Sequence, residues 1–213
     1  MVANSKMNGL KSLEELLART NQRFICVDTV FPEPGPGRFT AKIVHYAEPP
    51  LGIAQLEQLK RLFPEIPQLA EFYAHYGSIR LFVDPIGGDS AFFVASPDEW
   101  HGLKKLFETW TDLLDEDEED MLPDWLDNYL TIGEIPTSGN YYLMPTKGEH
   151  TGKVFLFDHD GFEFTEEGSD LGAFIERIST VNDALVEEIP GHTRYSDGET
   201  ETQWLAKEYL YDS

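Results

Sequence analysis

Apolar side chains recur along the chain with two different spacings, and each spacing predicts a type of element. Spacings of three and four residues place side chains on one helix face. They predict helices over residues 53–63, 67–77, 100–114 and 171–185. Alternating or continuously apolar runs are typical of strands. They predict strands over residues 24–28, 39–46, 79–83, 91–95, 129–135, 141–144, 154–157 and 162–164. Because helices and strands do not alternate regularly, we expect an α+β fold: a single domain with a central, mostly antiparallel or mixed sheet and helices packed against it.

Residues that favour helix ends and turns indicate where several of these segments begin or end. Gly77 is placed as the C-terminal glycine of the 67–77 helix, and Ser169 as the N-cap of the last helix. Residues 158–161, DHDG, join two strands in a hairpin whose turn angles aspartate and glycine tolerate. The apolar residues within 204–210 predict a short helix that docks on the body. We therefore expect an N-terminal helix and strand extension (1–48), an α+β core (49–190) and a C-terminal tail with this short docking helix (191–213).

The charge balance changes the expected class of partner. The chain has 213 residues, of which 39 are acidic and 16 basic, so its formal net charge is −23, although 41% of the residues are hydrophobic. A folded body with this charge repels the phosphates of nucleic acids and anionic lipid surfaces. We expect no nucleic acid and no membrane as partners, but a basic protein. No apolar segment approaches the roughly 20 residues of a membrane span, and the single cysteine, Cys26, permits no internal disulfide. Both features favour the cytoplasm.

A stretch without any positive charge is the main candidate for a functional surface. No lysine or arginine occurs between Lys105 and Lys147, and six acids follow one another without interruption inside this stretch. They are Asp115, Glu116, Asp117, Glu118, Glu119 and Asp120. Such a run is either a solvated loop or a docking surface for a positive partner. The predicted partner-binding surface adds the neighbouring residues Asp112, Asp124, Trp125 and Asp127, with Trp125 as an aromatic anchor.

Motifs of catalysis and cofactor binding are absent from the sequence. There is no GxSxG around a serine, no glycine-rich phosphate loop and no GxGxxG. The six histidines show no HExxH spacing, and one cysteine cannot build a thiolate zinc site. The acidic run lacks the glycine and the final carboxylate that a calcium loop needs. We expect no enzyme, no catalytic residues, no cofactor and no metal.

Parts of the sequence resemble one known superfamily. The segment LFPEIPQLAEFYAHYG (62–77), then IGEIPTSGNYYL, GKVFLFDHDG and SDLGAFIERI, resembles the helix, strand, hairpin and helix order of the SUKH superfamily over roughly residues 51–181. The resemblance implies an α+β domain without catalytic residues. It also implies a cytoplasmic immunity protein that neutralises a polymorphic bacterial toxin by steric and electrostatic occlusion. A nuclease-type toxin domain is one candidate for the basic partner. The alternative function is a regulatory scaffold or interaction protein of the same fold without a toxin partner.

Overall fold

The computed structural model describes residues 7, 9–19, 22–28, 39–83, 90–114, 122–181, 185 and 204–210, and for residues 22–28, 39–42 and 204–210 it describes the backbone. Helices of the described chain are α1 (Gly9–Leu17), α2 (Ile53–Leu62), α3 (Pro67–Tyr73), α4 (Trp100–Thr111) and α5 (Leu171–Ser179), with one 3-10 turn, η2 (Asp124–Asp127). Strands are β1 (Gln22–Asp28), β2 (Phe39–Ala47), β3 (Ile79–Val83), β4 (Ser90–Val94), β5 (Tyr129–Ile135), β6 (Asn140–Pro145), β7 (Val154–Asp158), β8 (Glu163–Gly168) and β9 (Trp204–Leu210). The predicted α+β class is confirmed.

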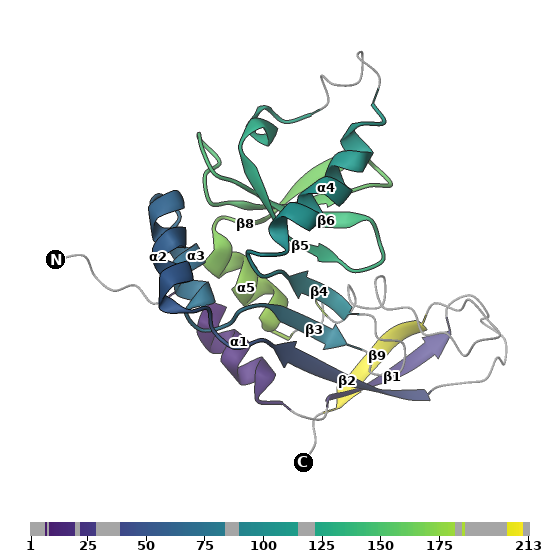
Figure 1. The fold of residues 1–213 in the computed structure, drawn as a ribbon. Coiled ribbons are helices and arrows are strands. Elements are labelled where there is room, and N and C mark those ends of the chain that lie inside the picture. Colours follow the sequence, from purple (N-terminus) through teal and green to yellow (C-terminus); the bar gives the residue numbers. More distant parts are fainter. Residues whose placement is uncertain are drawn as a thin grey trace.

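The described strands form one sheet in the order β8-β7-β6-β5-β4-β3-β2-β1-β9 (Figure 1). Every pair of neighbours is antiparallel. From β1 to β8 each strand therefore lies beside its neighbour in the sequence, although the β2–β3 connection carries α2 and α3 and the β4–β5 connection carries α4. Strand β9 is the exception, because it returns to the outer edge of β1.

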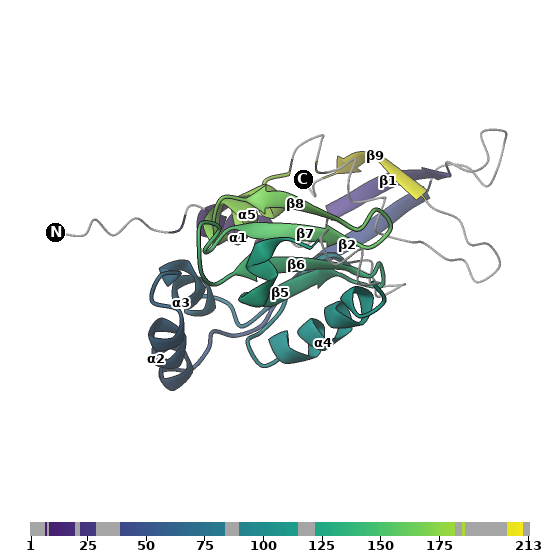
Figure 2. The same ribbon diagram turned by 90° about the horizontal axis from the view of Figure 1, so that it is seen from above.

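Helices lie on both faces of the sheet, as Figure 2 shows. On one face, Phe107 of α4 meets the rings of Tyr129, Tyr141 and Phe157 edge to face, with centroids 5.0 to 6.0 Å apart. On the other face, the ring of Phe174 of α5 lies 4.7 Å from that of Tyr142. Consecutive residues of β6 thus point to opposite faces, and the aromatic residues of this strand anchor a helix on each side.

The N-terminal segment is packed into the same body. Helix α1 lies against α5, and a Cβ atom on Gly9 would come within 2.5 Å of the backbone of Gly172 and Glu176. Only glycine permits this close helix contact. Strand β2 pairs with β1 on one side and with β3 on the other. The described residues before Glu48 therefore contribute directly to the sheet and to its helical cover.

Three local predictions were wrong. Helix α3 ends at Tyr73, so Gly77 is not its terminal glycine; a side chain at Gly77 would instead come within 2.5 Å of the carbonyl oxygen of Pro49. The N-cap of α5 is Asp170, whose Oδ1 accepts a hydrogen bond from the backbone N–H of Ala173 at 2.8 Å. In the β7–β8 hairpin, the left-handed backbone angle belongs to Phe162, with φ 53°, and not to the turn's aspartates or glycine.

The C-terminal prediction also needs a correction. Residues 204–210 form strand β9, not a short helix, and pair antiparallel with β1 from Arg23↔Leu210 to Asp28↔Trp204. The pairing provides hydrogen-bond partners for the backbone N–H and C=O groups on the edge of β1 that faces away from β2. Tertiary context decided the conformation of a segment whose local pattern suited either state.

Helix α2 is present as predicted, but its apolar stripe is mostly not buried. Of that stripe only Leu59 is buried, while Ile53 is 82% exposed and Leu62 is 55% exposed. The helix lies with α3 at the end of the molecule next to α1 (Figure 1). In the described part of the chain, no helix is both long and apolar enough to cross a membrane.

Candidate functional site

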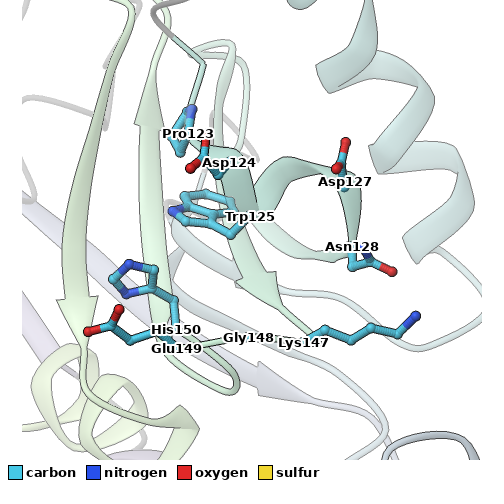
Figure 3. A pocket seen from close by; sticks show the side chains of 9 residues that line it. All are labelled: Pro123, Asp124, Trp125, Asp127, Asn128, Lys147, Gly148, Glu149 and His150. Carbon is cyan, nitrogen blue, oxygen red and sulfur yellow. The ribbon is translucent and has the colours of Figure 1, made fainter.

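Two hollows adjoin the short turn η2, and the second of them also borders the helix α4. We call the first, of about 490 Å³, the tryptophan hollow. It is lined by Pro123, Asp124, Trp125, Asp127, Asn128, Lys147, Gly148, Glu149 and His150 (Figure 3). The second, of about 610 Å³, is the acidic hollow. It is lined by Lys104, Phe107, Glu108, Thr111, Asp112, Leu122, Pro123, Asp124, Leu126, Asp127 and Tyr129.

Backbone hydrogen bonds fix η2 between these hollows. Pro123 has extended backbone angles, and its carbonyl accepts a hydrogen bond from the N–H of Leu126 at 3.0 Å. The turn ends at Asn128, whose N–H donates to the carbonyl of Trp125 at 3.1 Å. The carbonyl of Asn128 then accepts from the N–H and the hydroxyl of Thr146, at 2.8 and 3.2 Å. The turn is thereby bonded to the β6–β7 connection, which supplies the opposite wall of the tryptophan hollow.

Trp125 is held by two phenylalanine rings of the sheet edge. Its indole stacks on Phe155 of β7, with centroids 4.7 Å apart and planes at 24°, and meets Phe164 of β8 edge to face at 5.6 Å. The side chain remains half-buried and lines the tryptophan hollow. A large aromatic side chain is therefore presented in a fixed orientation, as is typical of interface anchors.

The floor of the acidic hollow combines aromatic rings with a Lys–Glu pair. The Lys104 ammonium lies 4.3 Å from the ring centroid of Tyr129 and 3.6 Å from Oε1 of Glu108. The Tyr129 hydroxyl donates to the same carboxylate at 3.5 Å. Burial raises the pKa of Tyr129, and the charge of Glu108 raises this pKa further. The phenol thus stays neutral and remains a donor at physiological pH.

The charges around the acidic hollow are unbalanced. Glu108, Asp112, Asp124 and Asp127 contribute four carboxylates, and Lys104 is the single ammonium among the lining residues. Asp112, Asp124 and Asp127 are exposed, so their charges reach into the solvent. An excess of negative charge in a hollow with aromatic walls favours cationic groups.

The structure brings together four of the residues predicted from the sequence. Asp112, Asp124, Trp125 and Asp127 gather around the two hollows, although α4 and η2 are separated along the chain. The acidic run Asp115–Asp120 lies outside the described residues, as does Met121; Leu122, the first residue after them, lines the acidic hollow.

Other lining residues were missed by sequence reasoning. Lys147, Glu149 and His150 come from the β6–β7 connection, and Lys104 and Tyr129 reach the acidic hollow from α4 and β5. No local pattern marked these residues. The signal that relates them to η2 is strand pairing, because Tyr129 pairs with Pro145 just before that connection.

A separate cluster at the β7–β8 hairpin has a structural explanation. Ligand atoms of Asp158, His159 and Asp160 lie within 4.8 Å of one another. Nδ1 of His159 lies 2.7 Å from Oδ1 of Asn140, which also accepts the backbone N–H of His159 at 3.1 Å, and Nε2 lies 3.1 Å from Asp160. Because the amide oxygen of Asn140 can only accept, Nδ1 is the donor in this contact. The ring also packs on Trp110 at 4.7 Å, so it secures the hairpin against α4.

No protein-family model matches the chain, and a comparison with curated proteins gives no match either.

Proposed function

We propose that this chain is a non-enzymatic protein-binding module: a cytoplasmic immunity protein that neutralises a polymorphic bacterial toxin. The observation that carries the proposal is the surface around η2, where carboxylates of two elements and a fixed tryptophan border two adjacent hollows. The SUKH-like order of elements between residues 51 and 181 supports the toxin as the class of partner.

The mechanism follows from the two kinds of side chain on this surface. Asp112, Asp124 and Asp127, together with the acidic run, attract a basic partner over the range of electrostatic steering. Trp125 and its aromatic neighbours then provide apolar contact area that slows dissociation. Binding over a basic cleft, such as that of a nuclease-type toxin domain, blocks access of its substrate. Neutralisation in this form needs no chemical step.

Growth rescue tests this function directly. The candidate partner is the variable C-terminal domain of a large secreted protein encoded next to this chain. Expression of that domain alone should stop bacterial growth, and co-expression of this chain should restore it, with a stable complex of the two purified proteins. A neighbouring toxin domain that this chain neither binds nor neutralises contradicts the proposal. Absence of such a neighbour together with binding to a housekeeping protein favours a regulatory scaffold instead.

Neutralising three acids beside the hollows should slow association with the toxin domain. In the variant Asp112→Asn, Asp124→Asn, Asp127→Asn we expect the association rate constant to fall on the order of tenfold at low salt and to depend less on ionic strength. The melting temperature should change by only a few degrees, because all three side chains are exposed. Stopped-flow or surface-based kinetics at several salt concentrations provide the measurement.

A matched control separates the effect of charge beside the hollows from the effect of the overall net charge. The variant Glu48→Gln, Glu65→Gln, Asp98→Asn removes the same net charge from exposed positions that line neither of the two hollows. It should change the association rate by less than twofold. Equal effects of the two variants would show that the overall charge steers the partner and not this surface. Asp117→Ser, Glu118→Ser, Glu119→Ser tests the acidic run in the same assay.

A further inference from the structure

One face of the Trp125 indole is already occupied and the other borders a hollow. Phe155 covers one face at a centroid distance of 4.7 Å, and Phe164 contacts the ring edge to face. The ring nevertheless lines the tryptophan hollow of about 490 Å³ (Figure 3). The electron-rich face of an indole is the best aromatic surface for a cation.

Two carboxylates line the same hollow as this ring. Asp124 precedes the tryptophan on η2, and Glu149 comes from the β6–β7 connection; both are exposed and line the hollow. The ammonium of Lys147, the single lysine among the lining residues, is directed away from the indole in Figure 3. At the same wall, Nδ1 of His150 is buried without a hydrogen-bond partner in the described part of the chain. A polar group that reached this nitrogen could supply the missing hydrogen bond.

At two other places in the protein, a basic side chain lies over an aromatic ring and near a carboxylate. Lys104 lies over Tyr129 at 4.3 Å, beside Glu108, and the guanidinium of Arg80 lies over Phe93 at 3.9 Å. Glu134 pairs with Phe93 across the strands. Burial raises the pKa of this carboxyl, and the charge of Arg80 opposes the shift. Among the described residues, no lysine or arginine lies over Trp125. Within the described part of the chain, the outward face of Trp125 therefore has no cation of its own.

We propose that the tryptophan hollow receives an arginine side chain of the basic partner, stacked on Trp125 and hydrogen-bonded to the carboxylate of Asp124 or Glu149. This inference rests on the proposed function, since it assumes a basic protein partner. Arginine fits better than lysine because its planar guanidinium can lie parallel to the indole while its N–H groups point sideways to the carboxylates.

Small probes test the site on the full chain without the partner. We would titrate ¹⁵N-labelled protein with acetyl-arginine amide, acetyl-lysine amide and acetyl-citrulline amide, and follow the indole N–H signal of Trp125, assigned from its loss in Trp125→Phe. Acetyl-arginine amide should shift this signal saturably, acetyl-lysine amide at least about threefold more weakly, and the uncharged citrulline not at all. Equal shifts with arginine and lysine, or with arginine and citrulline, overturn the proposal.

Variants locate the contacts. Trp125→Leu should weaken acetyl-arginine amide binding by about fivefold or more, read from backbone signals of Asn128 and Gly148, whereas Trp125→Phe should retain most of it. If Trp125→Leu does not fold, the exposed double variant Asp124→Asn, Glu149→Gln serves instead and should weaken binding by a similar factor. Unchanged binding in the folded variant overturns the arginine site.

The outcomes separate this site from the function on which it rests. If Trp125→Leu still binds and neutralises the toxin domain with unchanged kinetics, the arginine site is wrong and the proposed function stands. If the arginine probe binds at Trp125 but no toxin domain is neutralised, the site stands and the proposed function is wrong.

Discussion

Replacing Phe107 by alanine is expected to lower the free energy of unfolding by about 3–5 kcal/mol. This side chain is 1% exposed and is the point where α4 meets three strands, through Tyr129 of β5, Tyr141 of β6 and Phe157 of β7. Its removal leaves a cavity beneath the helix, and three edge-to-face contacts are lost with it. Urea unfolding followed by circular dichroism measures the change.

The neighbouring Leu106 provides the matched control. It occupies the same helix but is 52% exposed, so Leu106→Ala should change the free energy of unfolding by no more than about 0.5 kcal/mol. A loss below about 1 kcal/mol in Phe107→Ala would contradict the placement of α4 on the sheet. Since Phe107 also lines the acidic hollow, the variant should weaken toxin binding as well, in contrast to Leu106→Ala.

His45 should make the stability of the fold depend on pH. Its Nδ1 accepts a hydrogen bond from the backbone N–H of Phe82 at 3.1 Å, and the two rings meet edge to face at 4.8 Å. Phe82 itself has a φ of 55°, which is unusual for a side chain of this size. Burial lowers the pKa of His45 from 6.5 to about 4, and the charge of Arg19, two residues after α1, contributes to this shift.

The sign follows from the lowered pKa. As the pH falls below 6.5 the unfolded chain binds a proton at His45 before the folded chain does. The stabilisation contributed by the neutral side chain is therefore complete above about pH 6.5 and is lost progressively down to about pH 4. The difference between the two pKa values corresponds to about 3 kcal/mol.

Comparison of two histidine variants isolates this effect from that of the many carboxylates. His45→Asn keeps an acceptor for the N–H of Phe82 but cannot titrate, so its free energy of unfolding should fall by about 3 kcal/mol less than that of the parent between pH 6.5 and 4. His75→Asn, at an exposed position, should follow the parent curve. Parallel curves for the parent and His45→Asn would contradict the buried, neutral histidine.

Most elements could be predicted because their hydrophobic patterns are local. The strands between residues 79 and 164 and the helices α2 and α4 are present within a few residues of the expected limits. Strand β9 was mistaken for a helix because its partner, β1, is about as far away in the sequence as the chain allows. Gly77 was misinterpreted for a related reason, since what forbids a side chain there is the carbonyl of Pro49 and not a helix end.

The candidate surface could be predicted only in part. Asp112, Asp124 and Asp127 stand out as acids in a stretch without basic residues, and Trp125 stands out beside them. Nothing in the sequence indicates that Glu149 and His150 lie across a hollow from this tryptophan. That proximity depends on the pairing of β5 with β6 and on the hydrogen bonds between Asn128 and Thr146, which are contacts between distant segments.

The position of β9 beside β1 has a consequence for biosynthesis. Strands β1 to β8 can pair with their neighbours in the order in which they leave the ribosome, but β1 waits for residues 204–210 before its second edge is covered. Closing such a long loop is slow compared with forming a hairpin. A nascent chain that stalls before Trp204 leaves this edge open to other strands, so the unfinished protein is the form that most needs a chaperone.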